Sequence, residues 1–334
     1  MKVRDLGEFG LIELLTQIAN EEGVGYLSRP ELLIGIGDDT AAWENKSLIQ
    51  LGTTDILIQG IHFRLDLISW RELGWKSLAV NISDIAAMGG MPTYALISLG
   101  LPSDTEVEQV AELYKGMAEI ARRFKMAIVG GDISEAPLLI ISPSVIGNVE
   151  RDKLLLRSGA NPGDRIAVTG YLGLSAAGLK MLKEGLKFDS EVASLLGNAH
   201  LRPMPRVVEA QILVQQGIKT AIDISDGLVS DLTHICKLSN VGAKVWLKEI
   251  PLHPLTKAVF KEEALNLALS GGEDYELLFT GREESIKKAK ESISLPVTII
   301  GEITQDKPGK VILLDEHGKE VKWEEGGWEH FKAH

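Results

Sequence analysis

The sequence has very little of the residues and segments that define several common protein classes. Its 334 residues include a single cysteine, Cys236, so no disulfide can form within the chain and a zinc site built on cysteines is excluded. No apolar run reaches the length of a membrane span, and the first residues carry no apolar signal segment. We therefore expect a cytoplasmic protein with no membrane partner, in which Cys236 is a buried helix residue.

Clusters of lysine and arginine are also missing. A net charge of -12 repels nucleic acid unless a local basic patch compensates, and no such patch is visible, so we expect no nucleic-acid partner. The sequence contains neither a P-loop nor a Rossmann glycine pattern, so any nucleotide is bound in another way. An acidic protein that handles phosphates must recruit cations, and the charge balance therefore points toward a divalent metal.

The sequence does contain many short acidic turns of small residues. They occur at 35–39, 53–55, 83–84, 130–132, 223–227 and 271–274. A single aspartate in such a turn is usually a helix cap or a turn residue, but so many of them are hard to explain by packing alone. Carboxylates and hydroxyls brought together form a site of hard oxygen ligands, which suits Mg²⁺ bridging phosphates.

Four of these carboxylates lie in the N-terminal half, at Asp39, Asp55, Asp84 and Asp132. Converging without compensation they would repel one another strongly, whereas several Mg²⁺ ions and a polyphosphate remove that repulsion. We therefore expect a site that is incomplete until metal and nucleotide arrive. Hydrolysis by a Ser-His-Asp triad fits poorly, because no serine lies in a nucleophile elbow. Glycoside hydrolysis by paired carboxylates remains open on spacing alone.

The chain is long enough, at 45% hydrophobic residues, to bury a large core, and we expect two domains, 1–150 and 151–334. Helical spacing predicts helices at 6–19, 70–88, 228–238 and 283–292, and residues 102–105 are expected to cap a long helix that reaches 124. Apolar runs predict strands at 32–34, 47–54, 56–63, 93–101, 126–129, 138–149, 165–169, 220–224, 243–247, 275–279, 297–300 and 310–314.

Three features have two readings each. His62 is either a strand-end histidine or a ligand-facing one, and Tyr114 lies in an amphipathic helix, where a tyrosine is usually a core residue. The glycine turn at 170–173 opens a helix, so its amides could hold a phosphate. The alternative is that the two glycines serve only to bring the helix close to the sheet.

Read together, the motifs match a known family in order and over nearly the whole chain. They are Gly-Ile-Gly-Asp-Asp-Thr-Ala at 35–41, Thr-Thr-Asp at 53–55 with Gly-Ile-His-Phe at 60–63, Asn-Ile-Ser-Asp-Ile-Ala-Ala-Met-Gly-Gly at 81–90, Gly-Gly-Asp at 130–132, Asp-Ile-Ser-Asp-Gly at 223–227, Ser-Gly-Gly-Glu-Asp-Tyr-Glu-Leu at 270–277 and Gly-Trp-Glu-His-Phe at 327–331. As a set they resemble the thiamine-monophosphate kinase family of the aminoimidazole-ribonucleotide-synthetase-like ATP-binding superfamily.

This resemblance implies an α+β fold of two domains with a nucleotide cleft between them. The N-terminal α/β domain would bind ATP and Mg²⁺, and its sheet would pair into a barrel across a homodimer. The C-terminal α/β domain would complete the ATP and substrate site. The implied reaction is direct in-line transfer of the γ-phosphoryl group of ATP to thiamine monophosphate, giving thiamine diphosphate, with several Mg²⁺ ions.

The resemblance also implies roles for individual residues. The Mg²⁺ ligands would be Asp39, Thr53, Thr54, Asp55, Asp84, Asp132, Asp223 and Asp226, with Asp55, Asp84 and Asp226 as the catalytic set. The ATP contacts would be Tyr114, Gly131, Arg157 and Ser225. The substrate contacts would be His62, Glu273 (with Glu276 as the less favoured alternative) and Trp328. Trp328 would stack on a cationic ring, or it is a hydrophobic plug near the C-terminus.

Other members of the same superfamily fit less well. Selenophosphate synthetases carry a reactive cysteine or selenocysteine near the N-terminus, and the hydrogenase-maturation relative ends in a cysteine, whereas this chain ends at His334. Aminoimidazole-ribonucleotide synthetase is the second choice, and the motifs at 53–63 and 327–331 argue against it. A non-catalytic sensor of nucleotide or thiamine phosphate is a further alternative, although a sensor has no need of the intact acidic set.

Overall fold

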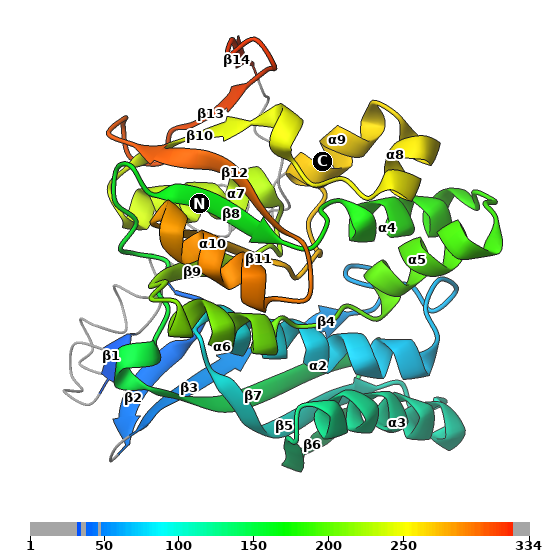
Figure 1. Cartoon of the computed structure of the whole chain (residues 1–334). Coiled ribbons are helices and arrows are strands. Elements are labelled where there is room, and N and C mark those ends of the chain that lie inside the picture. Colours follow the sequence, from blue (N-terminus) through cyan, green and yellow to red (C-terminus); the bar gives the residue numbers. More distant parts are fainter. Residues whose placement is uncertain (1–31, 35–37, 46–47, 323–334) are drawn as a thin grey trace, which may run out of the picture.

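The computed structural model describes residues 32–34, 38–45 and 48–322, which form a mixed α/β structure built around two sheets (Figure 1). The helix predicted at 6–19, most of the glycine turn at 35–37 and Trp328 lie outside the described residues. Within the described part, no helix has the length and apolarity that a membrane crossing requires.

The first sheet, in the lower half of Figure 1, is formed by the N-terminal strands. Its order is β1-β2-β3-β7-β5-β6, and β4 pairs with β7. All neighbours are antiparallel except β5 and β6, which are parallel and joined by a crossover through α3. The strands are β1 (Leu32–Ile34), β2 (Ala41–Asn45), β3 (Leu48–Thr54), β4 (Leu57–Ile58), β5 (Met91–Leu101), β6 (Ala127–Glu135) and β7 (Ile140–Glu150).

The helices α2 (Trp70–Ala87) and α3 (Val107–Arg123) pack against each other beside this sheet. A Cβ at Gly74 would lie 1.9 Å from the Leu113 carbonyl oxygen, and one at Gly116 would lie 1.8 Å from that of Arg71. Glycine at both positions therefore lets the two backbones approach closely. Helix α2 also contacts α6 and β9, so it is buried between the first sheet and the rest of the chain.

The second sheet is formed by the C-terminal strands in the order β14-β13-β10-β12-β8-β11-β9. Only β10 and β13 are parallel neighbours. The strands are β8 (Arg165–Thr169), β9 (Thr220–Asp223), β10 (Gly242–Trp246), β11 (Leu277–Gly281), β12 (Val297–Thr304), β13 (Val311–Leu314) and β14 (Glu320–Val321). The accompanying helices are α4 (Leu174–Glu184), α5 (Ser190–Leu201), α6 (Val207–Gln215), α7 (Leu228–Leu238), α8 (Pro254–Phe260), α9 (Glu263–Ser270) and α10 (Glu283–Ser292), with short 3-10 turns at Arg151–Lys153 and Leu247–Glu249.

Most predicted elements are confirmed, and four match to the residue: the strands at 32–34 and 165–169 and the helices at 228–238 and 283–292. Cys236 is buried in α7, as expected. The helix expected after the cap at 102–105 begins at Val107, and 102–105 forms a turn closed by the Thr105 amide donating to the Pro102 carbonyl. One strand prediction was clearly too long. The strand predicted at 56–63 shrinks to Leu57–Ile58, because the chain turns back at Gly60.

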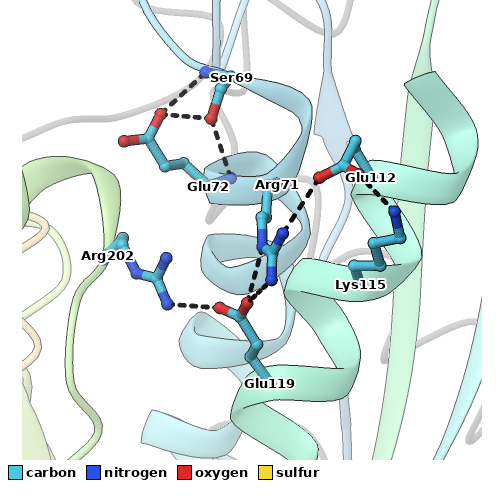
Figure 2. Close-up of polar contacts among 7 residues, drawn as sticks. All are labelled: Ser69, Arg71, Glu72, Glu112, Lys115, Glu119 and Arg202. Carbon is cyan, nitrogen blue, oxygen red and sulfur yellow. Dashed lines mark hydrogen bonds and ion pairs between the residues drawn. The ribbon is translucent and has the colours of Figure 1, made fainter. Parts of the chain in front are cut away.

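Polar contacts join the two halves of the chain near the start of α2 (Figure 2). Arg202, which follows α5, donates to Glu119 of α3 at 2.7 Å, and Arg71 of α2 donates to the same carboxylate at 2.7 Å. The Arg202 guanidinium also lies 4.3 Å from the ring centroid of Trp75, whose Nε1 donates to the Pro203 carbonyl at 2.8 Å. These contacts fix the segment between α5 and α6 on the surface of α2 and α3.

Candidate functional site

Three of the predicted metal ligands converge between the two sheets. Asp39 lies just before β2, Asp84 in α2 and Asp223 at the end of β9. One carboxylate oxygen from each lies within 4.8 Å of the other two. Ligands at about 2.1 Å from a magnesium ion are separated by up to about 4.2 Å, so this group is close to the size of a cation site.

The surroundings of this acidic cluster favour a bound cation. Burial raises the pKa of Asp84 well above its usual value, and the charges of Asp55, Asp223 and Asp39 raise it further. Burial likewise raises the pKa of Asp223, and Asp39 adds to the effect. These carboxylates point toward one another in a poorly hydrated place, where a divalent ion would stabilise their charged forms.

The segment that ends β3 supplies neighbours to the cluster. The Thr53 hydroxyl donates to Asp84 at 2.6 Å, and the Asp55 amide donates to the Asn81 side chain at 3.1 Å. Burial raises the pKa of Asp55 to about 6. Thr53 and Asp55 therefore lie beside Asp84, as their shared motif predicted.

Thr54 points to the other face of the sheet, because successive residues of a strand alternate. Its hydroxyl donates to the Pro143 carbonyl at 2.8 Å and accepts from Ser144 at 3.2 Å. Asp132 is exposed on the edge strand β6, opposite Ser98 of β5. The structure thus separates Thr54 and Asp132 from the cluster of Asp39, Asp84 and Asp223.

The residues predicted to contact ATP lie on different elements. Tyr114 of α3 is partly buried and packs against the core of the first sheet, which is also the ordinary role of a helical tyrosine. Gly131 lies in β6, where a Cβ would fall 1.9 Å from the Ile97 carbonyl oxygen, so only glycine fits. Arg157 is held by Asp39 through two bonds of 3.0 and 2.8 Å. In this structure that guanidinium neutralises part of the acidic cluster.

The loop after β9 is fixed by an aspartate that the sequence analysis missed. The carboxylate of Asp231, in the first turn of α7, accepts hydrogen bonds from the amides of Ser225, Asp226 and Gly227 at 3.1, 3.2 and 3.1 Å. Asp223, at the other end of this loop, accepts from the Ser83 hydroxyl at 2.6 Å. The only sequence signal for Asp231 was an acidic residue at the start of a helix, which is common in helices of every function.

The segment 270–277 distinguishes the two glutamates proposed for the substrate. Glu276 is buried, and its carboxylate accepts from Arg206 at 2.7 Å and from the Thr169 hydroxyl at 2.6 Å. The Glu273 side chain is 33% exposed and pairs with Lys76 at 2.8 Å. His62 lies close enough for its charge to lower the pKa of Glu273. The geometry therefore favours Glu273 as the carboxylate that is open to a ligand.

The glycine turn at 170–173 has its amides occupied by the protein itself. Asp274 accepts from the Gly173 amide at 2.7 Å and from the Ser175 amide at 3.2 Å. A Cβ at Gly173, which has φ +77°, would lie 2.7 Å from the Ala268 amide nitrogen. Close packing is therefore the reading that the structure favours, with Asp274 in the place that a phosphate would take.

Comparison with known proteins agrees with this arrangement. The family model for the AIR synthase related protein, N-terminal domain, matches residues 37–149, and that for the C-terminal domain matches 161–314. The chain is 37% identical to the thiamine-monophosphate kinase of Aquifex aeolicus over 335 residues, which cover 99% of this chain and all of that protein. It is 39% identical to the Escherichia coli K12 enzyme over 311 residues, covering 91% of this chain and 94% of that protein.

Solved structures give the same result. The structure of AaThiL complexed with AMPPCP and TMP superposes with a TM-score of 0.84 at 36% identity, covering 99% of each chain. A hydrogenase maturation protein HypE in complex with ATP has a TM-score of 0.68 at 18% identity, covering 81% of this chain and 83% of its own, and shows the shared fold alone. The matched models define two AIR synthase related domains. The chain belongs to the thiamine-monophosphate kinase family.

Proposed function

We propose that this protein transfers the γ-phosphoryl group of ATP to thiamine monophosphate, producing thiamine diphosphate and ADP. Its relatives at 37–39% identity are thiamine-monophosphate kinases, and a structure at 36% identity holds an ATP analogue together with TMP. The observation that carries the proposal is the acidic cluster, which gives this chain oxygen ligands within 4.8 Å of one another. Such a cluster suits a reaction in which two phosphate groups must be brought together.

We propose that Mg²⁺ is the metal at this site. The available donors are carboxylates and a threonine hydroxyl, which are hard oxygen ligands of the kind that Mg²⁺ prefers. Asp39, Asp84 and Asp223 would hold it together with Thr53 and Asp55, while Asp132 and Asp226 would serve further ions. Thr54 is left out of this proposal, because its hydroxyl is bonded on the other face of the sheet. When bound, magnesium ions neutralise charge on the transferring phosphoryl group.

The residues of the chain mainly position the two substrates. The attacking phosphate oxygen of thiamine monophosphate needs little deprotonation, so no dedicated general base is required and Asp226 would position a metal or orient the nucleophile. In this proposal Tyr114, Gly131, Arg157 and Ser225 contact ATP. The absence of a side chain at Gly131 supports that assignment, whereas the Ser225 amide donates to Asp231, so Ser225 would contact ATP through its other atoms.

For the second substrate we propose His62 and Glu273, together with Trp328 from the C-terminal segment. The thiamine ring system carries a positive charge, which an ionised carboxylate stabilises at close range. Although burial opposes it, the charge of Lys76 keeps the pKa of Glu273 below its usual value, so this carboxylate is ionised near neutral pH. Glu276, enclosed by Arg206, is less suited to the role.

We also propose that the chain acts as a homodimer through the first sheet. Strand β6 is a long edge strand whose residues are almost all exposed, and Tyr94 and Leu96 of the neighbouring β5 are 50% and 43% exposed. Unpaired edges and apolar patches of this kind are usually covered in native proteins. We expect the wild type to sediment as a dimer and Leu96→Glu to weaken it, whereas a monomeric wild type would contradict the proposal.

Product formation from Mg-ATP and thiamine monophosphate tests the reaction itself. Free thiamine and the aminoimidazole-ribonucleotide precursor are assayed in parallel under the same conditions. Thiamine diphosphate should appear with the monophosphate alone. Turnover of the purine precursor instead would move the activity to aminoimidazole-ribonucleotide synthesis, and ATP binding without any turnover would favour a sensor.

A further inference from the structure

The segment that carries Glu273 is held in an unusual backbone conformation. Glu273 and Tyr275 both adopt positive φ values, of 56° and 50°, and the preceding Gly272 has φ 64°. Side-chain-bearing residues rarely occupy this left-handed region, and they do so mainly where the surrounding structure fixes them. Here the Glu273 amide donates to the Ser225 carbonyl at 2.7 Å and the Tyr275 amide to the Ile224 carbonyl at 2.9 Å.

The Glu273 side chain is held by residues from two other elements. Lys76 lies in the middle of the buried helix α2, its side chain is 4% exposed, and its Nζ is 2.8 Å from Glu273 Oε1. His200, near the end of α5, places Nδ1 3.5 Å from Glu273 Oε2 and 3.1 Å from the Ser175 hydroxyl. Lys76, from the N-terminal half of the chain, therefore lies at one oxygen of this carboxylate, and His200, from the C-terminal half, lies at the other.

These contacts differ from those of the other glutamate in the segment. Glu276 is enclosed by Arg206 and Thr169 and is 4% exposed, so its ion pair holds the fold together. The Glu273 side chain keeps a third of its surface exposed, although its cationic partner is buried. A buried lysine that contacts a partly open carboxylate fixes that group in one direction and leaves its outer surface available to a ligand.

We propose that Lys76, with His200, is a positioning residue that holds Glu273 in the orientation needed to receive the cationic thiamine part of the substrate. The inference rests on the proposed function and deepens it, because neither residue belongs to the acidic set or to the predicted substrate contacts. It also gives a role to the buried charge of Lys76 in α2. Because Lys76 and Asp84 both lie in α2, this helix would position the Glu273 carboxylate that faces the substrate as well as the acidic cluster.

A double-mutant cycle tests the proposal on the purified enzyme. Lys76→Met, Glu273→Gln and the double variant are compared with the wild type by kcat and by separate KM values for ATP and thiamine monophosphate. Lys76→Met should raise the KM for thiamine monophosphate about tenfold or more and leave the KM for ATP within about twofold. In the Glu273→Gln background the same change should have an effect below about twofold, because Lys76 acts through Glu273. Lys76→Arg should restore most of the loss.

The matched control is the buried ion pair of Arg206 and Glu276 in the same segment. Arg206→Met should lower thermal stability without a selective effect on either KM. Should Lys76→Met fail to fold, His200→Ala in the same cycle decides the question, with a smaller selective rise in the KM for thiamine monophosphate, about threefold. The inference would be overturned if Lys76→Met had the same effect in the wild type and in Glu273→Gln, or if it raised the KM values for ATP and thiamine monophosphate equally. A wild type that does not phosphorylate thiamine monophosphate would instead overturn the proposed function.

Discussion

Two groups of buried carboxylates in this molecule have the same chemistry and different surroundings. In the first group each carboxylate accepts from donors of its own. Asp231 accepts from three backbone amides, Asp274 from two, and Glu276 from an arginine and a threonine hydroxyl. Asp39, Asp84 and Asp223 point toward one another, with the guanidinium of Arg157 and the hydroxyls of Thr53 and Ser83 at their edge. Burial raises the pKa of Asp231 and Asp274 in the first group and of Asp84 and Asp223 in the second, so burial alone does not mark a site. The direction in which the carboxylates point does.

The largest effect is expected from a change in the cluster. Asp84→Asn removes a carboxylate that repels its neighbours, so we expect kcat to fall by about 10³-fold while the melting temperature of the metal-free protein stays level or rises. Steady-state kinetics and thermal unfolding of the same preparation measure both. Near-normal turnover in Asp84→Asn would show that the cluster is not the reaction site.

A change in the other group should have the opposite balance. The amides of residues 225–227 all donate to one oxygen of Asp231, and Asp231→Asn replaces that carboxylate by a neutral amide. Because the hydrogen bonds lose their charged acceptor, we expect a loss of about 2–4 kcal/mol in unfolding free energy and a modest fall in kcat of about tenfold. Urea denaturation measures the first and kinetics the second. If Asp231→Asn proved as stable as the wild type but inactive, the distinction between the two groups would fail.

The pH dependence of the melting temperature, measured with and without Mg²⁺, should distinguish the carboxylates near the metal site from the others. Burial and Asp39 raise the pKa of Asp38 to about 7, and burial raises that of Asp55 to about 6, above their usual value of 3.8. Groups whose pKa is raised on folding stabilise the protein at low pH, and this stabilisation is lost as pH rises through the folded-state value. The melting temperature of the metal-free protein should therefore fall between about pH 4 and pH 8.

Added Mg²⁺ should remove only part of that fall. Burial also raises the pKa of Asp274 to about 7, and its partners are backbone amides, so its contribution is independent of metal. Melting curves with Mg²⁺ and with a chelator, run across this range, measure the two parts. Identical pH profiles in both conditions would contradict the assignment of the metal to the cluster.

The smallest effect is expected from a carboxylate far from both groups. Glu119 accepts hydrogen bonds from two partly exposed arginines (Figure 2), and ion pairs that solvent screens in this way contribute little. Glu119→Gln should change the unfolding free energy by less than about 1 kcal/mol and leave kcat unchanged. A large loss of turnover would mean that the docking of Arg202 on α3 governs the reaction.

The sequence predicted much of this arrangement and missed specific parts of it. The α7 and α10 helices follow from local spacing, and the aspartates of the cluster stood out because small residues and hydroxyls surround them. Lys76, Arg206 and Asp231 were missed, since each acts through a partner that is distant in sequence or through backbone amides that the fold brings together. Thr53 and Thr54 were assigned one role as neighbours, whereas strand alternation directs them to opposite faces.

The most direct test of the account counts the metal ions that the cluster holds. Bound Mn²⁺ is measured by electron paramagnetic resonance at saturating AMPPCP for the wild type, Asp84→Asn and Glu276→Gln. We predict that Asp84→Asn binds fewer ions, or binds them at least about tenfold more weakly, while Glu276→Gln matches the wild type. Equal binding by the wild type and Asp84→Asn would contradict the claim that converging carboxylates define the site.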